Sequence, residues 1–232
     1  MKNAAELTTL VKNVLNTAWA TREGRVVPEA SDLKLGNDAI TLDGTVLYAD
    51  LADSTGLVQG YKNWFAAEVY KCYLMCASEM IRGNGGSITA FDGDRVMGVF
   101  IGDSKNSNAA KCALQINYAV TQIINPAIKE KYPTSAYEVK QAVGIDSSSL
   151  FVAKTGVRGD NDLVWIGRAA NYAAKLCSLR DGNYASVITA DVYNKLSESS
   201  KYGGNPKQDM WTKFTWQETG LTAYHSSWHW KP

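Results

Sequence analysis

The sequence predicts one α+β domain in which a single sheet is backed by helices. From Thr45 onward, short apolar runs of strand length alternate with longer segments whose apolar residues recur at helical spacing. The chain has 232 residues, of which 45% are hydrophobic. That much apolar material builds the core of one ordinary domain, and a second full domain would not fit comfortably beside it.

The elements can be placed from the apolar pattern and the turn residues. Strands are predicted at residues 45–50, 86–91, 95–100, 137–146, 149–156 and 163–166. Helices are predicted at residues 60–86, 106–132 and 168–179. Asp92, Gly93 and Asp94 form a strong turn signal, so the strands that flank them should pair as a hairpin. Ser147 and Ser148 are expected to separate the next two strands.

Strand, helix, hairpin, helix and strand in this order give a ferredoxin-like βαββαβ sheet with helices on one face. Residues 1–24 have helical spacing and predict an extra N-terminal amphipathic helix. A polar connector follows, so we divide the chain into residues 1–44 and a main domain, 45–232. The Trp-rich tail, 211–230, alternates at period two and predicts C-terminal edge strands, in which His225 and His229 have packing or surface roles.

Charge and composition restrict the partners. Lys and Arg number 24 against 23 Asp and Glu, and a net charge of +1 provides no global field to attract nucleic acid or an anionic membrane. No segment is long and apolar enough to span a bilayer, and we expect a cytoplasmic protein. The cysteines Cys72, Cys76, Cys112 and Cys177 form no C-x-x-C pair, so reduced thiols are expected. Cys72 and Cys76 share a helix face and are expected in the core.

Two aspartates lie where strands end. Asp50 closes the first strand, and Asp94 lies at the tip of the hairpin. In a ferredoxin-like sheet the first strand lies beside the hairpin, so both carboxylates can converge on one edge. Carboxylates and a backbone carbonyl suit Mg²⁺ or Mn²⁺, which in turn bind triphosphate oxygens. On position alone, an alternative without metal is equally good: Asp50 would cap the turn to the next segment, and Asp94 would be the favoured residue of a tight turn.

Three motifs resemble the catalytic domain of class III adenylyl and guanylyl cyclases, over about residues 45–180. VLYADLADST is similar to the first metal motif of that family, GGSITAFDGDRVMGVF to the second, and DLVWIGRAANYAAKL to its transition-state helix. The resemblance implies that Asp50, Asp94 and the carbonyl of Leu51 bind two divalent metal ions, Mn or Mg. It further implies that Asn171 positions the ribose and that Lys175, in place of the usual arginine, stabilises charge on the phosphorus.

The same resemblance implies a nucleotide cyclase that needs no protein nucleophile. A metal-activated ribose 3′-hydroxyl would attack the α-phosphorus in line and release pyrophosphate. Asp50 and Asp94 would come from one subunit, and Asn171 and Lys175 from its partner, so a homodimer builds two composite sites. The expected partner is a nucleoside triphosphate, with no nucleic acid and no membrane, and the effector that receives the product is not a stable partner.

The base pocket departs from the purine-specific pattern. Ala90 and Val164 replace the lysine and aspartate that read a purine, and Tyr48 precedes Asp50 by two residues. This pattern resembles the bacterial pyrimidine cyclases of Pycsar anti-phage systems and implies a cyclic UMP or cyclic CMP product. We favour UTP over CTP, because the relatives that look most similar make cyclic UMP. The alternatives are a purine cyclase with an unusual pocket and a non-catalytic nucleotide-binding module that dimerises.

The segment after Asp50 should begin a short helix whose free N–H groups point at the triphosphate. A third carboxylate close to the triphosphate is unfavourable, so Asp53 is expected to point away. The residues expected to contact substrate are Tyr48, Ala52, Ser54, Thr55, Gly56, Ala90, Phe91, Val164 and Trp165.

Overall fold

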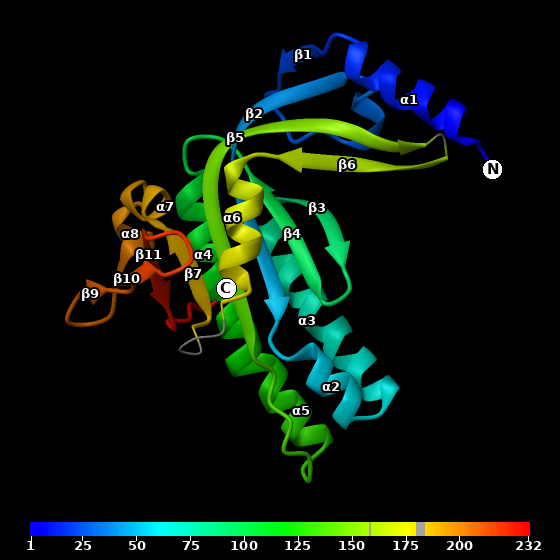
Figure 1. Cartoon of the computed structure of the whole chain (residues 1–232). Coiled ribbons are helices and arrows are strands. Elements are labelled where there is room, and N and C mark those ends of the chain that lie inside the picture. Colours follow the sequence, from blue (N-terminus) through cyan, green and yellow to red (C-terminus); the bar gives the residue numbers. More distant parts are fainter. Residues whose placement is uncertain (158, 180–183) are drawn as a thin grey trace.

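The computed structural model describes residues 1–157, 159–179 and 184–232 (Figure 1). Its helical segments are α1 (Ala4–Asn16), η1 (Ala30–Asp32), α2 (Ser54–Gly60), α3 (Asn63–Gly83), α4 (Lys105–Tyr118), η2 (Ala119–Ile124), α5 (Asn125–Lys131), α6 (Arg168–Cys177), α7 (Ala190–Asn194) and α8 (Glu198–Lys201). Its strands are β1 (Ala20–Glu23), β2 (Asp38–Leu51), β3 (Ser87–Asp92), β4 (Arg95–Phe100), β5 (Gln141–Val157), β6 (Asp160–Ile166), β7 (Ser186–Thr189), β8 (Tyr202–Gly203), β9 (Gln208–Asp209), β10 (Thr212–Trp216) and β11 (Leu221–Ser226).

The main sheet has the order β10-β11-β7-β5-β2-β4-β3, with β1 paired to β2 and β6 paired to β5. Its inner part, β5-β2-β4-β3, is antiparallel throughout and has the strand order of a ferredoxin-like βαββαβ unit. The predicted fold class is therefore confirmed. The longest ladder joins β2 to β5, from the pair Ala39 and Ala153 to the pair Leu51 and Gln141.

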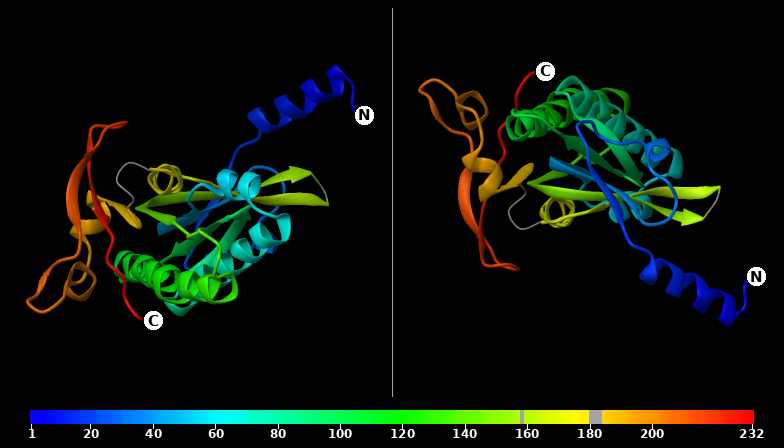
Figure 2. Two further views of the ribbon diagram at one scale, coloured as in Figure 1. Left: turned by 90° about the horizontal axis from the view of Figure 1, so that it is seen from below. Right: turned by 90° about the horizontal axis from the view of Figure 1, so that it is seen from above.

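Helices cover both faces of this sheet. Leu47 and Ala49 of β2 belong to the core that packs under α3 and α4, which are the two long helices of the ferredoxin-like unit. Val46, which alternates with them, belongs to a second core on the opposite face, together with Ala169 and Ala173 of α6. Figure 2 shows α6 and the long helices on opposite sides of the sheet. The helices of the predicted unit thus lie on one face, and α6 adds a layer on the other.

Strand β5 is continuous, so the predicted break at Ser147 and Ser148 is wrong. The hydroxyl of Ser147 donates to the carbonyl of Gly44 at 3.3 Å and accepts from the hydroxyl of Thr45 at 3.2 Å. Because these partners on β2 satisfy the serine, a residue typical of turns remains inside a buried strand.

The predicted N-terminal helix forms, but only over Ala4–Asn16, because Ala20–Glu23 pair with β2 as strand β1. The helix lies away from the rest of the fold (Figure 2). Asn3 and Glu6 form a capping box at its start. Strand β2 begins at Asp38, so the division that we placed at residue 44 falls inside a strand. Among the residues described, no helix combines the length and the apolar character needed to cross a membrane.

The C-terminal strands β10 and β11 lie at one edge of the sheet, as predicted. His225 of β11 stacks on Tyr184 with ring centroids 3.6 Å apart, which is a packing role. The prediction that Cys72 is a core residue is wrong, because α3 turns that side chain to solvent, and Cys76 is half-buried. Cys112 is fully buried, and burial raises the pKa of its thiol.

Gly144 of β5 lets α6 lie directly on the sheet. A Cβ at this position would come within 2.1 Å of the carbonyl oxygen of Ala173 and 2.4 Å of the amide nitrogen of Cys177, and backbone cannot give way cheaply. We predict that Gly144→Ala lowers the free energy of unfolding by about 2–3 kcal/mol in urea denaturation. Gly83→Ala is the control, because a Cβ there meets nothing within 4 Å, and it should stabilise by roughly 0.5 kcal/mol or more. Equal stabilities for the two variants would contradict the close approach of α6.

Candidate active site

The two aspartates singled out in the sequence meet at one end of the sheet. Asp50 is paired with Arg95 in the β2–β4 ladder, and Asp94 directly precedes Arg95 in the hairpin turn. Both aspartates line an open cavity of about 410 Å³, together with Leu51, Ser54, Thr55 and residues of the turn. Asp53, which we expected to point away, also lines it. The structure therefore brings together the residues predicted to hold metal and two of those predicted to contact the triphosphate.

This cavity suits a hard divalent cation. Within the described part of the chain, the Oδ2 atom of Asp94 is buried and has no hydrogen-bond partner. A buried carboxylate oxygen without a donor is costly unless a cation lies against it. No group of three or more His, Cys, Asp or Glu side chains that could hold a metal occurs among the described residues. Metal ions here would be held by Asp50, Asp94 and the Leu51 carbonyl, with substrate oxygens and water completing their shells.

The start of α2 differs from the expectation of free N–H groups. Asp53 adopts a left-handed backbone conformation, with φ of 58°, and its carboxylate accepts a hydrogen bond from the N–H of Gly56 at 3.2 Å. For Gly56 the prediction is therefore wrong, because the carboxylate of Asp53 already caps that N–H. Gly56 and Ala52 line a separate cavity of about 1050 Å³ that also borders Asp53 and Gln141.

The guanidinium of Arg95 and the phenol of Tyr48 lie side by side, next to Asp50 and Asp94. Tyr48 is the diagonal neighbour of Arg95 across the β2–β4 ladder, and the Arg95 guanidinium lies 5.1 Å from the centre of the Tyr48 ring. Arg95 donates to Asp92 at 2.8 Å, while its Nε is buried and has no partner among the residues described. Ala90 packs on the same face as Tyr48. The sequence pattern alone did not single out Arg95, although it directly follows Asp94.

The Tyr48 phenol and the Arg95 guanidinium both keep their protons at neutral pH. Burial raises the pKa of the Tyr48 phenol above its ordinary value. Burial by itself lowers the pKa of Arg95, but the hydrogen bond to Asp92 and the nearby charge of Asp50 outweigh it, so that the pKa is raised. Arg95 therefore offers the cavity a permanently charged guanidinium as a hydrogen-bond donor, and Tyr48 offers a hydroxyl beside it.

The other residues predicted at the base pocket separate into two groups. Trp165 packs on the same face as Tyr48 and Ala90. Val164 precedes Trp165 on β6 and so faces the opposite side of that strand. Phe91 is 58% exposed and borders a groove with Leu74 and Met75 of α3. Tyr48, Ala90 and Trp165 thus share one face of the sheet within one chain, whereas Val164 and Phe91 do not lie on that face.

Asn171 and Lys175 lie one turn apart on α6, and both side chains are exposed. In the described chain neither residue borders the cavity that contains Asp50 and Asp94. Lys175 instead pairs with Glu218, which lies in the turn between β10 and β11. Among the described residues of one chain, α6 therefore does not contribute to this cavity.

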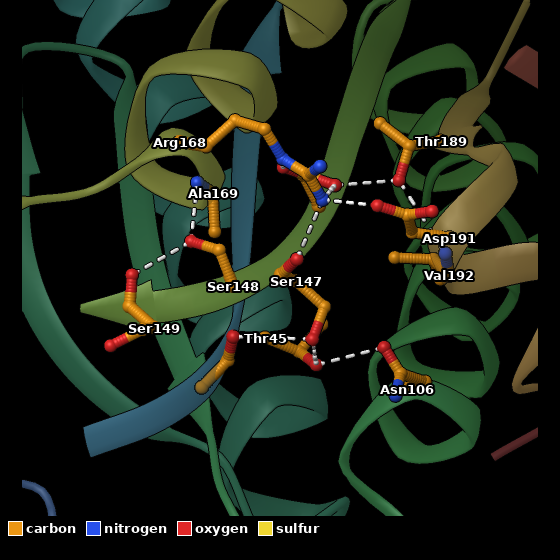
Figure 3. A network of polar contacts seen from close by, with 12 residues as sticks. Thr45, Asn106, Ser147, Ser148, Ser149, Arg168, Ala169, Thr189, Asp191 and Val192 are labelled. Carbon is orange, nitrogen blue, oxygen red and sulfur yellow. Dashed lines mark hydrogen bonds and ion pairs between the residues drawn. The ribbon is translucent and has the colours of Figure 1, made fainter. Parts of the chain in front are cut away.

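A polar network at the start of α6 was not foreseen from the sequence (Figure 3). Arg168, the first residue of α6, forms an ion pair with Asp146 of β5, whose side chain is fully buried. Ser148 of β5 accepts a hydrogen bond from the N–H of Ala169 at 3.0 Å. Ser148 lies in the break that we expected between two strands, and Asp146 ends the strand predicted before that break, so nothing marked them as partners of a helix.

Comparison with known proteins identifies the family. No protein-family model matches the chain. A uridylate cyclase of Xanthomonas perforans is 53% identical over 228 residues, which cover 97% of each chain. A uridylate cyclase of Burkholderia cepacia is 50% identical over 232 residues, which cover 99% of each chain. The chain belongs to the uridylate cyclase family. Like its relatives, it is a nucleotide cyclase and hence a lyase.

Solved structures show the same fold at low sequence identity. The guanylyl cyclase Cya2 matches this uridylate cyclase family member with a TM-score of 0.67 at 16% identity, over 83% of this chain and 95% of that chain. A bacterial light-regulated adenylyl cyclase matches with a TM-score of 0.66 at 18% identity, over 80% and 90% of the two chains. The fold is therefore that of class III cyclase domains.

We predict that Asp94→Asn lowers turnover by about a hundredfold or more, because it removes one carboxylate charge from the metal-binding pair. It should not lower the thermal midpoint of unfolding, since a buried oxygen without a partner contributes nothing to stability. Asp43→Asn serves as the control, because Asp43 lies on β2, the strand that carries Asp50, but is exposed and pairs with Lys105. Parental turnover of Asp94→Asn in Mg²⁺ would contradict the assignment.

Proposed function

We propose that the chain converts UTP into 3′,5′-cyclic UMP and pyrophosphate. The observation that carries this proposal is the position of Tyr48 beside Arg95, which lines the cavity that contains Asp50 and Asp94. Two relatives at 50–53% identity that are named uridylate cyclases support the same substrate. The enzyme is proposed to act as a cytoplasmic homodimer.

Hydrogen-bond chemistry favours uracil at this position. A guanidinium can only donate, and the C4 carbonyl of uracil can only accept, whereas cytosine carries an amino group there. The Nε of Arg95 is the donor that would otherwise stay unpaired among the described residues. Tyr48 fills volume that a larger base would need, and Ala90 offers nothing to a purine edge. A purine would therefore lose solvent hydrogen bonds without regaining them.

The reaction breaks the bond between the α-phosphorus and the bridging oxygen and forms a bond to the ribose 3′-oxygen. Two divalent ions, Mg²⁺ or Mn²⁺, would activate that hydroxyl and neutralise the leaving pyrophosphate when bound at Asp50, Leu51 and Asp94. Asn171 of the second subunit orients the ribose. Lys175 of that subunit stabilises charge on the phosphorus, for which it must exchange Glu218 for the substrate.

We further propose that the cyclic nucleotide serves as a second messenger in anti-phage defence. Its effector would bind the product and not the enzyme. Cells that carry the gene should accumulate cyclic UMP after phage infection, and cells that carry the Asp94→Asn variant should not. Equal nucleotide levels in the two strains would contradict this role.

The substrate proposal is tested by competition. The purified protein is incubated with ATP, GTP, CTP and UTP at equal concentrations and with Mn²⁺, and the cyclic products are identified by mass. Cyclic UMP should be the main product. A main product from either purine would show that the reading of Tyr48, Ala90 and Arg95 is wrong, and a main product of cyclic CMP would show that the guanidinium argument is wrong.

The same competition assay on two variants distinguishes the contribution of the Tyr48 ring to UTP turnover from that of its hydroxyl. Tyr48→Ala should lower UTP turnover by roughly tenfold or more, because one buried hydrogen bond and the ring contact are lost. Tyr48→Phe keeps the ring and should lose less. Parental turnover in both variants would place the base elsewhere.

A further inference from the structure

Helix α6 carries two residues that the proposed site needs, so its position on the sheet decides whether they reach the substrate. Strand β5 holds the helix at three points. Towards its C-terminal end, the helix backbone lies on Gly144, where a Cβ would come within 2.1 Å of the carbonyl oxygen of Ala173. At its N-terminal end, Ser148 accepts from the N–H of Ala169 at 3.0 Å.

The third point is an ion pair with a fully buried carboxylate. Arg168 donates from Nε to Oδ2 of Asp146 at 3.0 Å and from Nη2 to Oδ1 at 3.3 Å. Nη2 also donates to the carbonyl of Ser147 at 2.9 Å, and the Thr189 hydroxyl donates to Oδ1 of Asp146 at 2.6 Å. Arg168 pairs in addition with Asp191 of α7. Figure 3 shows the guanidinium pointing into this network between β5 and α7.

Arg168 has a different role from Asn171 and Lys175 on the same helix. Arg168, Asn171 and Lys175 follow one another at spacings of three and four residues and lie on one helix face. Asn171 and Lys175 are exposed, whereas the fork of Arg168 is directed at the sheet. A two-pronged pair to a carboxylate with no exposed surface fixes both the rotation and the height of the first turn.

We propose that Arg168 and Asp146 are positioning residues of the cyclisation reaction, which set α6 so that Asn171 and Lys175 meet the triphosphate bound by the other subunit. The inference rests on the composite site of the proposed function. A displacement of about 1 Å in groups that act on the transition state costs on the order of a hundredfold in rate. Misplaced α6 residues should therefore slow the chemical step more than they weaken substrate binding.

The first test is the kinetics of Arg168→Gln, measured together with its thermal midpoint, because the substitution leaves the buried Asp146 carboxylate without its counter-charge. kcat should fall by about ten- to a hundredfold while KM changes by less than about threefold. Arg168→Lys, which keeps the charge without the fork, should recover part of the loss. The control is Arg22→Gln, which removes an arginine–aspartate pair to Asp38 far from α6 and should keep parental kinetics.

The second test uses heterodimers of two differently tagged chains, purified through both tags. Arg168→Gln paired with Asp50→Ala should regain about half of the parental turnover, because one of the two composite sites is then intact. Arg168→Gln paired with Asn171→Ala should stay at or below the turnover of Arg168→Gln alone, since both copies of α6 are impaired. The reference heterodimer, Asp50→Ala with Asn171→Ala, should also regain about half.

The outcomes distinguish the positioning role from the composite site itself. An inactive reference heterodimer would overturn the composite site, and the positioning proposal with it. If the reference is active, three results overturn the positioning role alone: parental kcat in Arg168→Gln, a raised KM at unchanged kcat, or failure of Asp50→Ala to restore Arg168→Gln. The last result would mean that the substitution damages the whole fold rather than α6.

Discussion

The carboxylate of Asp146 lies with no exposed surface in the middle of the sheet, and the elements around it must satisfy its charge. A buried charge is stable only when paired and hydrogen-bonded. Arg168 supplies the counter-charge from α6, and Thr189 supplies a hydroxyl from the end of β7. The same arginine reaches Asp191 on α7. One buried group thus ties a helix and the C-terminal part of the sheet to β5.

Strand β5 in turn is held by its ladder to β2. This ladder connects Asp50 and Asp94 to α6, which carry the two halves of the proposed site within one chain. One end of this ladder lies at Leu51, next to the carboxylates of Asp50 and Asp94. The same strands support α6 on the face of the sheet that lies away from α3 and α4. The sheet therefore presents Asp50 and Asp94 at one end and exposed α6 residues on one face, and in the proposed mechanism two copies complete this arrangement for each other. Homodimerisation follows from this division of the residues within the proposed mechanism.

Local features were predictable from the sequence, and features that depend on distant partners were not. The hairpin follows from Asp92-Gly93-Asp94 between apolar runs, and it places Asp94 correctly. Ser147 was misread because its partner, Thr45, lies 102 residues away. Arg95 became visible only once strand register placed it diagonally from Tyr48. In both of these cases, the deciding contact joins two strands and leaves no periodic signal in either.

The central claim is that one chain holds half of each active site. It is tested most directly by measuring turnover per chain across a dilution series while the mass of the protein is followed by sedimentation on the same samples. Turnover per chain should fall in parallel with the dimer fraction and return when the protein is concentrated again. Full turnover per chain in a solution where the protein sediments as a monomer would contradict the account.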